Sequence, residues 1–187
     1  AVPDLVFSRW RDDLPNLSYL ADHGISGKLE SSFPAITVPA WTSMLSGRDP
    51  GELGIYGFRN RADHSYDNMF IATSGAVREK RIWDYLSQAG RQSMIIGVPQ
   101  TYPTKPLLGN LVSGFLTPDS ESNFTFPSTL RNEVLQVVPD YDFDVRNFRT
   151  NRKDWLLEQL TSMMERRYQL VDHLLQQKTW DYFMLME

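Results

Sequence analysis

The chain has no cysteine among its 187 residues. This absence excludes disulfide bonds, thiolate nucleophiles and zinc sites built on cysteine. It also agrees with a cytoplasmic protein, which is the location that we expect. Histidine is scarce, since His23, His64 and His173 lie far apart and no two of them have the spacing of a metal-binding pair. We therefore expect these side chains to lie at the surface or in packing contacts rather than to bind a metal ion.

The sequence also lacks long apolar runs and concentrated positive charge. No segment approaches the roughly 20 apolar residues that a membrane-spanning helix needs, and the first residues do not show the pattern of a signal peptide. The formal net charge is −4, and lysine and arginine are spread along the chain. Because nucleic-acid binding needs a concentrated basic face, we expect neither a nucleic acid nor a membrane as a partner. Glycine-rich dinucleotide and P-loop fingerprints are absent as well.

What remains is an ordinary globular composition, with 41% hydrophobic and 22% charged residues. The apolar pattern predicts helices at 15–24, 39–47, 82–90, 127–137 and 153–177, and strands at 93–98, 110–115 and 180–187. Residues 28–32 are expected to be extended, and 48–80 to form a long irregular surface loop. Helices that alternate with buried strands predict an α/β fold with a mostly parallel sheet and helices on both faces, in one domain over 1–187.

The segment Ile36–Gly47, ITVPAWTSMLSG, places a threonine and a proline just ahead of a predicted helix. Threonine is a favoured N-cap, because its side-chain oxygen accepts a hydrogen bond from a main-chain N–H in the first turn. The same unpaired N–H groups and the helix dipole favour an anion, so a phosphoryl group would also be held there. A hydroxyl becomes a useful nucleophile only when a base or a metal ion removes its proton. The spacing alone leaves both roles of Thr37 open.

Two arginines follow this helix in the sequence GFRNR. Arg59 and Arg61 could hold a phosphate group through the paired N–H groups of their guanidinium ions, which makes them candidate substrate-binding residues. Two solvated loop arginines would give the same pattern, so this alternative stays open too.

A longer pattern runs through Phe33–Phe58: Thr-x-Pro-x-x-x-Ser-x-x-Ser/Thr-Gly, followed by Pro-x-x-x-Gly-Ile. The matching residues are Thr37, Pro39, Ser43, Ser46, Gly47, Pro50, Gly54 and Ile55. In this pattern the chain resembles the nucleophile segment of the type I phosphodiesterase/nucleotide pyrophosphatase family, within the alkaline phosphatase superfamily. The similarity extends to LPNLSYLADHG upstream and to GVPQTYPTKPLLGNLVSGFLTP downstream.

The resemblance implies a metal-dependent hydrolase of phosphoric esters, a phosphodiesterase or phosphohydrolase, whose partner is a small phosphate-ester substrate. It implies two divalent metal ions, expected to be Zn²⁺, and gives Thr37 the role of nucleophile. One metal ion would bind the Thr37 alkoxide, which attacks phosphorus in line and forms a covalent phospho-enzyme. A metal-bound water would then hydrolyse this intermediate.

Family members also contain metal ligands that this chain does not match. They begin with an apolar strand ending in a metal-binding aspartate, shortly before the segment that corresponds to Ala1–Asp4. They continue past the strand corresponding to Trp180–Glu187 into further aspartate and histidine ligands. The resemblance thus implies that the chain is an internal part of an alkaline phosphatase-like catalytic domain, incomplete by itself. We expect the remaining ligands to lie outside it, and residues 1–187 alone to be inactive and to bind zinc weakly or not at all.

A second interpretation belongs to a different functional class. The chain would be a non-catalytic α/β module that binds an anion or a partner, in which Thr37 only caps its helix. A phosphoryl-transferring mutase of the same superfamily fits less well, because such enzymes use serine in a different local pattern.

Overall fold

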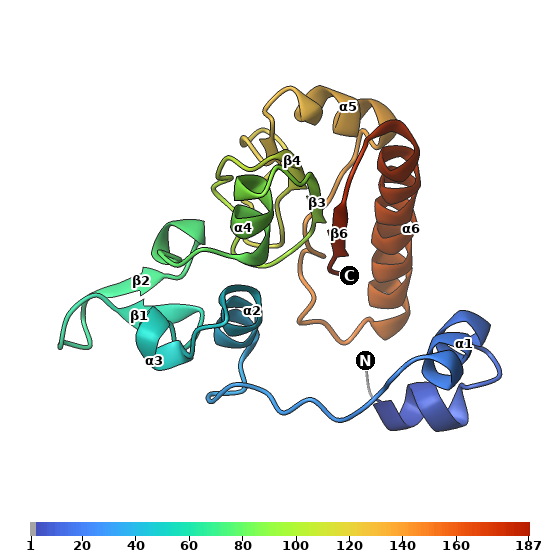
Figure 1. Ribbon diagram of the computed structural model, residues 1–187, viewed down its shortest axis with the longest axis horizontal. Coiled ribbons are helices and arrows are strands. Elements are labelled where there is room, and N and C mark those ends of the chain that lie inside the picture. The colour runs from blue at the N-terminus through green and yellow to red at the C-terminus, as the bar shows by residue number, and fades with distance from the viewer. Residues whose placement is uncertain (1–2) are drawn as a thin grey trace. The chain divides into compact units, whose positions relative to one another are not determined.

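The computed structural model of the chain describes residues 3–187. The chain forms two compact units, Ala1–Ser31 and Ser32–Glu187, which are described separately. Figure 1 shows the helices and strands of both. That 1–187 form one domain stays a prediction.

Within the described residues of the first unit, the regular structure is helical. The π-helical turn η1 (Leu5–Arg9) precedes α1 (Pro15–His23), and Pro15 occupies the first turn of α1 as its fixed backbone angle favours. The helix ends one residue before the predicted bound, because Gly24 has a φ of −112° and continues into extended backbone.

The extended segment predicted at 28–32 does not form a strand of the sheet. Residues 25–36 are irregular, and the apolar side chains of Ile25, Leu29 and Phe33 are exposed. Without a buried face, this segment has no packing that would favour a place in a parallel sheet. Thr37 therefore does not follow directly after a strand of the sheet.

A four-stranded sheet forms the centre of the second unit, in the order β5-β4-β3-β6. Its strands are β3 (Ser93–Ile96), β4 (Gly109–Val112), β5 (Thr125–Phe126) and β6 (Tyr182–Leu185). Strand β3 runs parallel to both β4 and β6, whereas β5 is antiparallel to β4. All four residues of β3 are buried, which explains its continuous apolar run. The prediction of a mostly parallel sheet is confirmed.

Two helices cover one face of this sheet, α5 (Leu130–Val137) and α6 (Lys153–Gln177). Met94 and Ile96 of β3 point to this face, since alternate strand residues lie on the same side. They pack into a buried cluster with residues of both helices, including Leu170. Figure 1 shows α6 running alongside the sheet.

The opposite face is covered by α2 (Thr37–Ser46) and α4 (Ile82–Gln88). Ile95 of β3 points to this side and packs with Leu45 of α2 and Trp83 of α4. Because helices lie on both faces of a mostly parallel sheet, the predicted α/β fold class is confirmed.

The region 48–80 contains more regular structure than the predicted loop. It includes α3 (Pro50–Leu53), β1 (Arg59–Arg61), β2 (Met69–Ile71) and the 3₁₀ turn η2 (Ser74–Ala76). Strands β1 and β2 form an antiparallel hairpin, and α3 begins with a reciprocal cap between Asp49 and Glu52. Elements of three or four residues are too short to show a periodic apolar pattern, so the sequence did not reveal them.

Helix α6 has the bounds that its apolar repeat predicted, but only its second half is in the core. Leu170, Val171 and Leu174 are buried, whereas Leu160 and Met164 are exposed. The periodicity of the sequence shows which face of the helix is apolar and not what covers it. Across residues 3–187, α6 included, no helix is long and apolar enough to cross a membrane.

Candidate functional site

Helix α2 begins at Thr37, the residue that the sequence pattern singled out. Ile36 is the N-cap, with extended backbone and no side-chain capping bond, so Thr37 is the first helical residue and not the cap. The first main-chain bond of the helix runs from the Ala40 N–H to the Ile36 carbonyl at 3.0 Å. The N–H groups of Thr37 and Val38 precede it and have no helical acceptor. With an exposed hydroxyl beside them, this helix start can face an anion in solvent.

Buried side chains hold this end of α2 in place. Val38 is fully buried and packs with Ile55 and Val77 in a small apolar cluster. Pro39 is buried as well, so the exposed Thr37 stands directly beside two fixed residues. The backbone that carries the Thr37 hydroxyl is therefore anchored by packing.

A buried polar contact ties α2 to the loop that follows the carboxyl end of β3. The single proton of the Thr42 hydroxyl is shared between two acceptors, the Val38 carbonyl at 2.7 Å and the carboxamide oxygen of Gln100. The Gln100 amide in turn donates to the Ala72 carbonyl at 3.3 Å. Gln100 is buried at a φ of 57°, a backbone region that residues with a side chain rarely adopt. This loop thus connects the sheet to the helix of Thr37.

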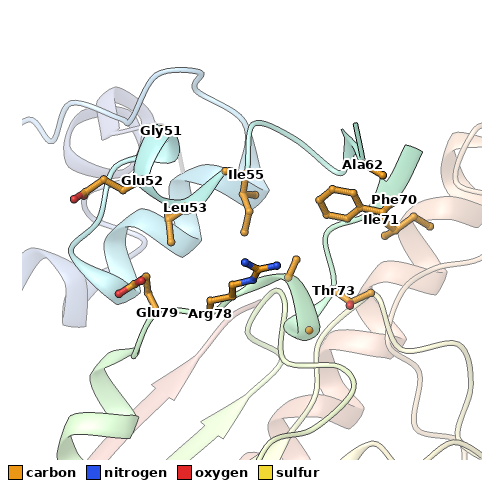
Figure 2. Close-up of a pocket in the computed structure, with 13 residues that line it drawn as sticks. Gly51, Glu52, Leu53, Ile55, Ala62, Phe70, Ile71, Thr73, Arg78 and Glu79 are labelled. Atoms are coloured by element: carbon orange, nitrogen blue, oxygen red, sulfur yellow. The ribbon is translucent and has the colours of Figure 1, made fainter. Parts of the chain in front are cut away.

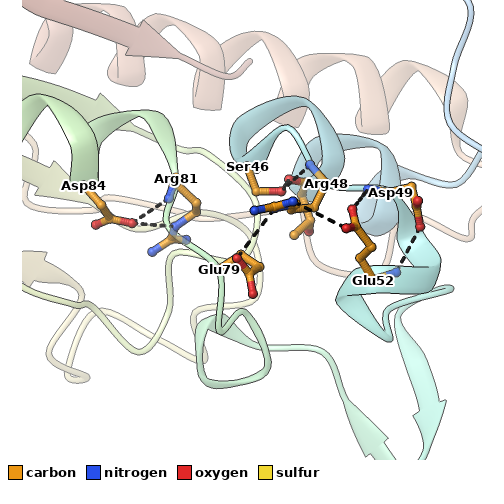
Figure 3. A network of polar contacts seen from close by, with 8 residues as sticks. Ser46, Arg48, Asp49, Glu52, Glu79, Arg81 and Asp84 are labelled. Atoms are coloured by element: carbon orange, nitrogen blue, oxygen red, sulfur yellow. Dashed lines mark hydrogen bonds and ion pairs between the residues drawn. The ribbon is translucent and has the colours of Figure 1, made fainter.

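Arg81, the N-cap residue of α4, contacts the same loop. Its guanidinium donates to the Gln100 carbonyl at 2.9 Å, lies 4.5 Å from the centre of the Trp83 ring and faces Asp84 at 3.9 Å. Figure 3 shows Arg81 beside Asp84 at the start of α4. Burial lowers the pKa of the Arg81 guanidinium, and the negative charge of Asp84 opposes this shift. An arginine stays charged even so, and these contacts compensate the buried cation.

The two candidate substrate-binding arginines lie on β1. Arg59 and Arg61 are both exposed at either side of the buried Asn60. The Arg61 guanidinium lies 4.9 Å from the centre of the Tyr66 ring. The contacts found between residues 3 and 187 do not bring either arginine to Thr37, so their role in substrate binding stays a prediction.

The described part of the chain does not fit the two-metal site that the resemblance implies. No three histidine, aspartate or glutamate side chains converge there in a way that could hold a metal ion. His23 stacks on Tyr19 at 4.1 Å between ring centres, and His173 lies 3.0 Å from a carboxylate oxygen of Glu133. His64 is exposed in the β1–β2 hairpin.

The sequence missed two features of this region. The contacts among Thr42, Arg81 and Gln100 join three distant segments, and no local sequence pattern marks them. A pocket of about 860 Å³ also lies beside α3 and the hairpin, and no motif marks it, because its lining comes from several short elements. Neither Thr37 nor Arg59 nor Arg61 lines this pocket.

Comparison with known proteins agrees with the sequence pattern. A family model described as Type I phosphodiesterase / nucleotide pyrophosphatase matches residues 2–187, which includes α2 and the whole sheet. Searches of the curated proteins and of the solved structures gave no significant match. The chain thus belongs to the type I phosphodiesterase/nucleotide pyrophosphatase family, a family of phosphoric ester hydrolases.

Proposed function

We propose that this chain carries the nucleophile of a metal-dependent phosphoric ester hydrolase, a phosphodiesterase or phosphohydrolase, and that the nucleophile is Thr37. Membership of the family supports the reaction class. The location of Thr37 supports its proposed role as the nucleophile. It is exposed as the first residue of α2, beside main-chain N–H groups without helical acceptors. A small phosphate ester is the proposed substrate.

The proposed reaction has two steps. The Thr37 oxygen forms a bond to phosphorus while the bond from phosphorus to the leaving alcohol breaks, so a diester substrate leaves its second ester group on the transferred phosphorus. Water then cleaves the bond between phosphorus and the Thr37 oxygen and regenerates the hydroxyl. The N–H groups of Thr37 and Val38 and the positive end of the helix dipole would stabilise the phosphoryl oxygens. Arg59 and Arg61 are proposed to contribute positive charge to substrate binding.

Two divalent metal ions, with zinc as the expected element, belong to this proposal as well. Bound metal ions supply the positive charge that lets a hydroxyl lose its proton near neutral pH. Since residues 3–187 do not form a ligand set for them, the roles proposed for this chain are those of its own hydroxyl, N–H groups and guanidinium ions.

The test is hydrolysis of bis-p-nitrophenyl phosphate by the intact protein. Thr37→Ala is expected to abolish turnover while the far-ultraviolet circular dichroism and the melting temperature stay those of the wild type. Thr161→Ala serves as the matched control, because Thr161 is an exposed threonine of α6, and it should leave turnover unchanged. Unchanged turnover in Thr37→Ala would remove Thr37 from the mechanism, whereas absence of turnover by the wild type would favour the non-catalytic, anion-binding alternative.

A further inference from the structure

The pocket beside α3 combines an apolar wall with several polar groups. Apolar side chains from α3, the following turn and the hairpin line it: Leu53, Ile55, Ala62, Phe70 and Ile71. Its volume of about 860 Å³ lies within the range of pockets that hold small organic molecules. Figure 2 shows these side chains around an open space between α3 and β2.

The acidic residues at the rim of this pocket are already paired. Arg48 lies 3.4 Å from a carboxylate oxygen of Glu52 and 3.8 Å from one of Glu79. Figure 3 shows Arg48 between the two carboxylates. The Glu52 carboxylate also accepts a hydrogen bond from the Asp49 N–H. Both acids are thus held by contacts outside the pocket.

Arg78 is left as the charged group that faces the cavity. Figure 2 shows its guanidinium pointing into the pocket below Ile55, while the carboxylates of Glu52 and Glu79 point away from it. Within residues 3–187, Arg78 forms no ion pair and no side-chain hydrogen bond. Thr73, on the opposite side of the pocket, adds a hydroxyl. A cation with unused N–H donors beside an apolar wall is suited to a ligand that has an acidic group and an apolar body.

We propose that this pocket binds a small organic anion, with its carboxylate or phosphate-type group on Arg78 and its aromatic or branched apolar body against Ile55, Phe70 and Ile71. The site is distinct from the proposed nucleophile, because Thr37 is not among the lining residues. Its floor is rigid, since Ile55 is buried and packs in one cluster with Val38, Ala72 and Val77.

The first part of the test asks which ligand chemistry binds. The isotope-labelled intact protein is titrated in NMR experiments with phenylacetate, benzylphosphonate, inorganic phosphate and the neutral 2-phenylethanol. Saturable chemical-shift changes at Ile55, Phe70 and Thr73 are expected with either aromatic anion. The anion that binds more tightly identifies the preferred acidic group. Inorganic phosphate and 2-phenylethanol should each bind at least about tenfold more weakly, because phosphate has no apolar body and 2-phenylethanol has no acidic group.

The second part uses matched variants at exposed positions. Arg78→Leu should weaken binding of the preferred anion by about tenfold or more. Arg149→Leu changes the charge equally outside the pocket and should leave binding unchanged. Ile71→Asp places a negative charge on the lining and should also weaken binding, whereas Met69→Asp, on the same strand but away from the lining, should not.

Three results would overturn the proposal: no saturable shift with either aromatic anion, shifts confined to residues 37–40, or binding that Arg78→Leu and Ile71→Asp leave unchanged. Because binding is measured without turnover, a failure here is distinguishable from a failure of Thr37 as nucleophile.

Discussion

The side chains of Thr42 and Gln100, 58 positions apart in the chain, form a buried hydrogen bond that joins α2 to the loop after β3. The helix that begins at Thr37 is therefore held by a polar contact with this loop as well as by apolar packing. The position of the Thr37 hydroxyl thus depends on residues that no nucleophile motif contains.

Replacing Thr42 with valine tests this contact. The side chain keeps its shape but loses the hydroxyl, so the buried Gln100 oxygen is left without that donor, and we expect a loss of about 2 kcal/mol in the free energy of unfolding. Urea denaturation measures the change. Thr42→Ser keeps the hydroxyl and should lie closer to the wild type. A Thr42→Val protein as stable as the wild type would show that the contact contributes nothing.

The two arginines of Figure 3 should differ in their effect on stability. Arg81→Met removes the donor of the buried Gln100 carbonyl and the cation beside Asp84, so we expect a loss of about 2 kcal/mol. Arg48→Met removes two exposed ion pairs and should cost no more than about 1 kcal/mol. Thermal and urea unfolding of both variants give the comparison. Equal losses would contradict the role assigned to Arg81.

The carboxylate of Asp181 makes the free energy of unfolding depend on pH. Its carboxylate accepts the Gln92 N–H at 2.8 Å and pairs with Arg91 at 3.1 Å, which fixes the start of β6 beside β3. The hydrogen bond from Gln92 lowers the pKa of Asp181 below 3.8, and Arg91 adds to this effect while burial opposes it. Because the pKa is lower in the folded state, the stabilisation is complete above pH 3.8 and is lost as the pH falls through the folded-state value.

Asp181→Asn should accordingly be less stable than the wild type at neutral pH. The difference should shrink as the pH falls below 3.8, because the wild-type carboxyl becomes neutral there too. Unfolding free energies measured across this pH range give the result. A difference that stays constant down to the most acidic point would show that the charge of Asp181 is not responsible.

The parts of the fold that the sequence predicted are those with long or continuous apolar patterns. The apolar repeat over 153–177 predicted the bounds of α6. The apolar run at 93–98 predicted the buried strand β3, because burial on both faces requires apolar residues throughout. The hairpin around Arg59 and the pocket around Arg78 were not predicted. Both depend on segments of a few residues that meet only in the folded chain.

The candidate site was predictable only in part. Resemblance singled out Thr37, and the structure shows it exposed at the start of α2. Its anchoring by Thr42, Gln100 and Arg81 could not be predicted, since side chains far apart in sequence carry no local signal of their contact. The exposure of Leu160 and Met164 on α6 was missed for a related reason: an apolar stripe does not tell what lies over it.

The most direct test of the account is to find the residue that carries the phosphoryl group. The intact protein is mixed with a p-nitrophenyl phosphodiester, quenched in acid within the first turnover, digested and analysed by mass spectrometry. We predict on Thr37 a phosphoryl group that still carries the second ester substituent of the substrate, and no modified peptide from Thr37→Ala. This group on a different residue, or full turnover by Thr37→Ala, would contradict the account.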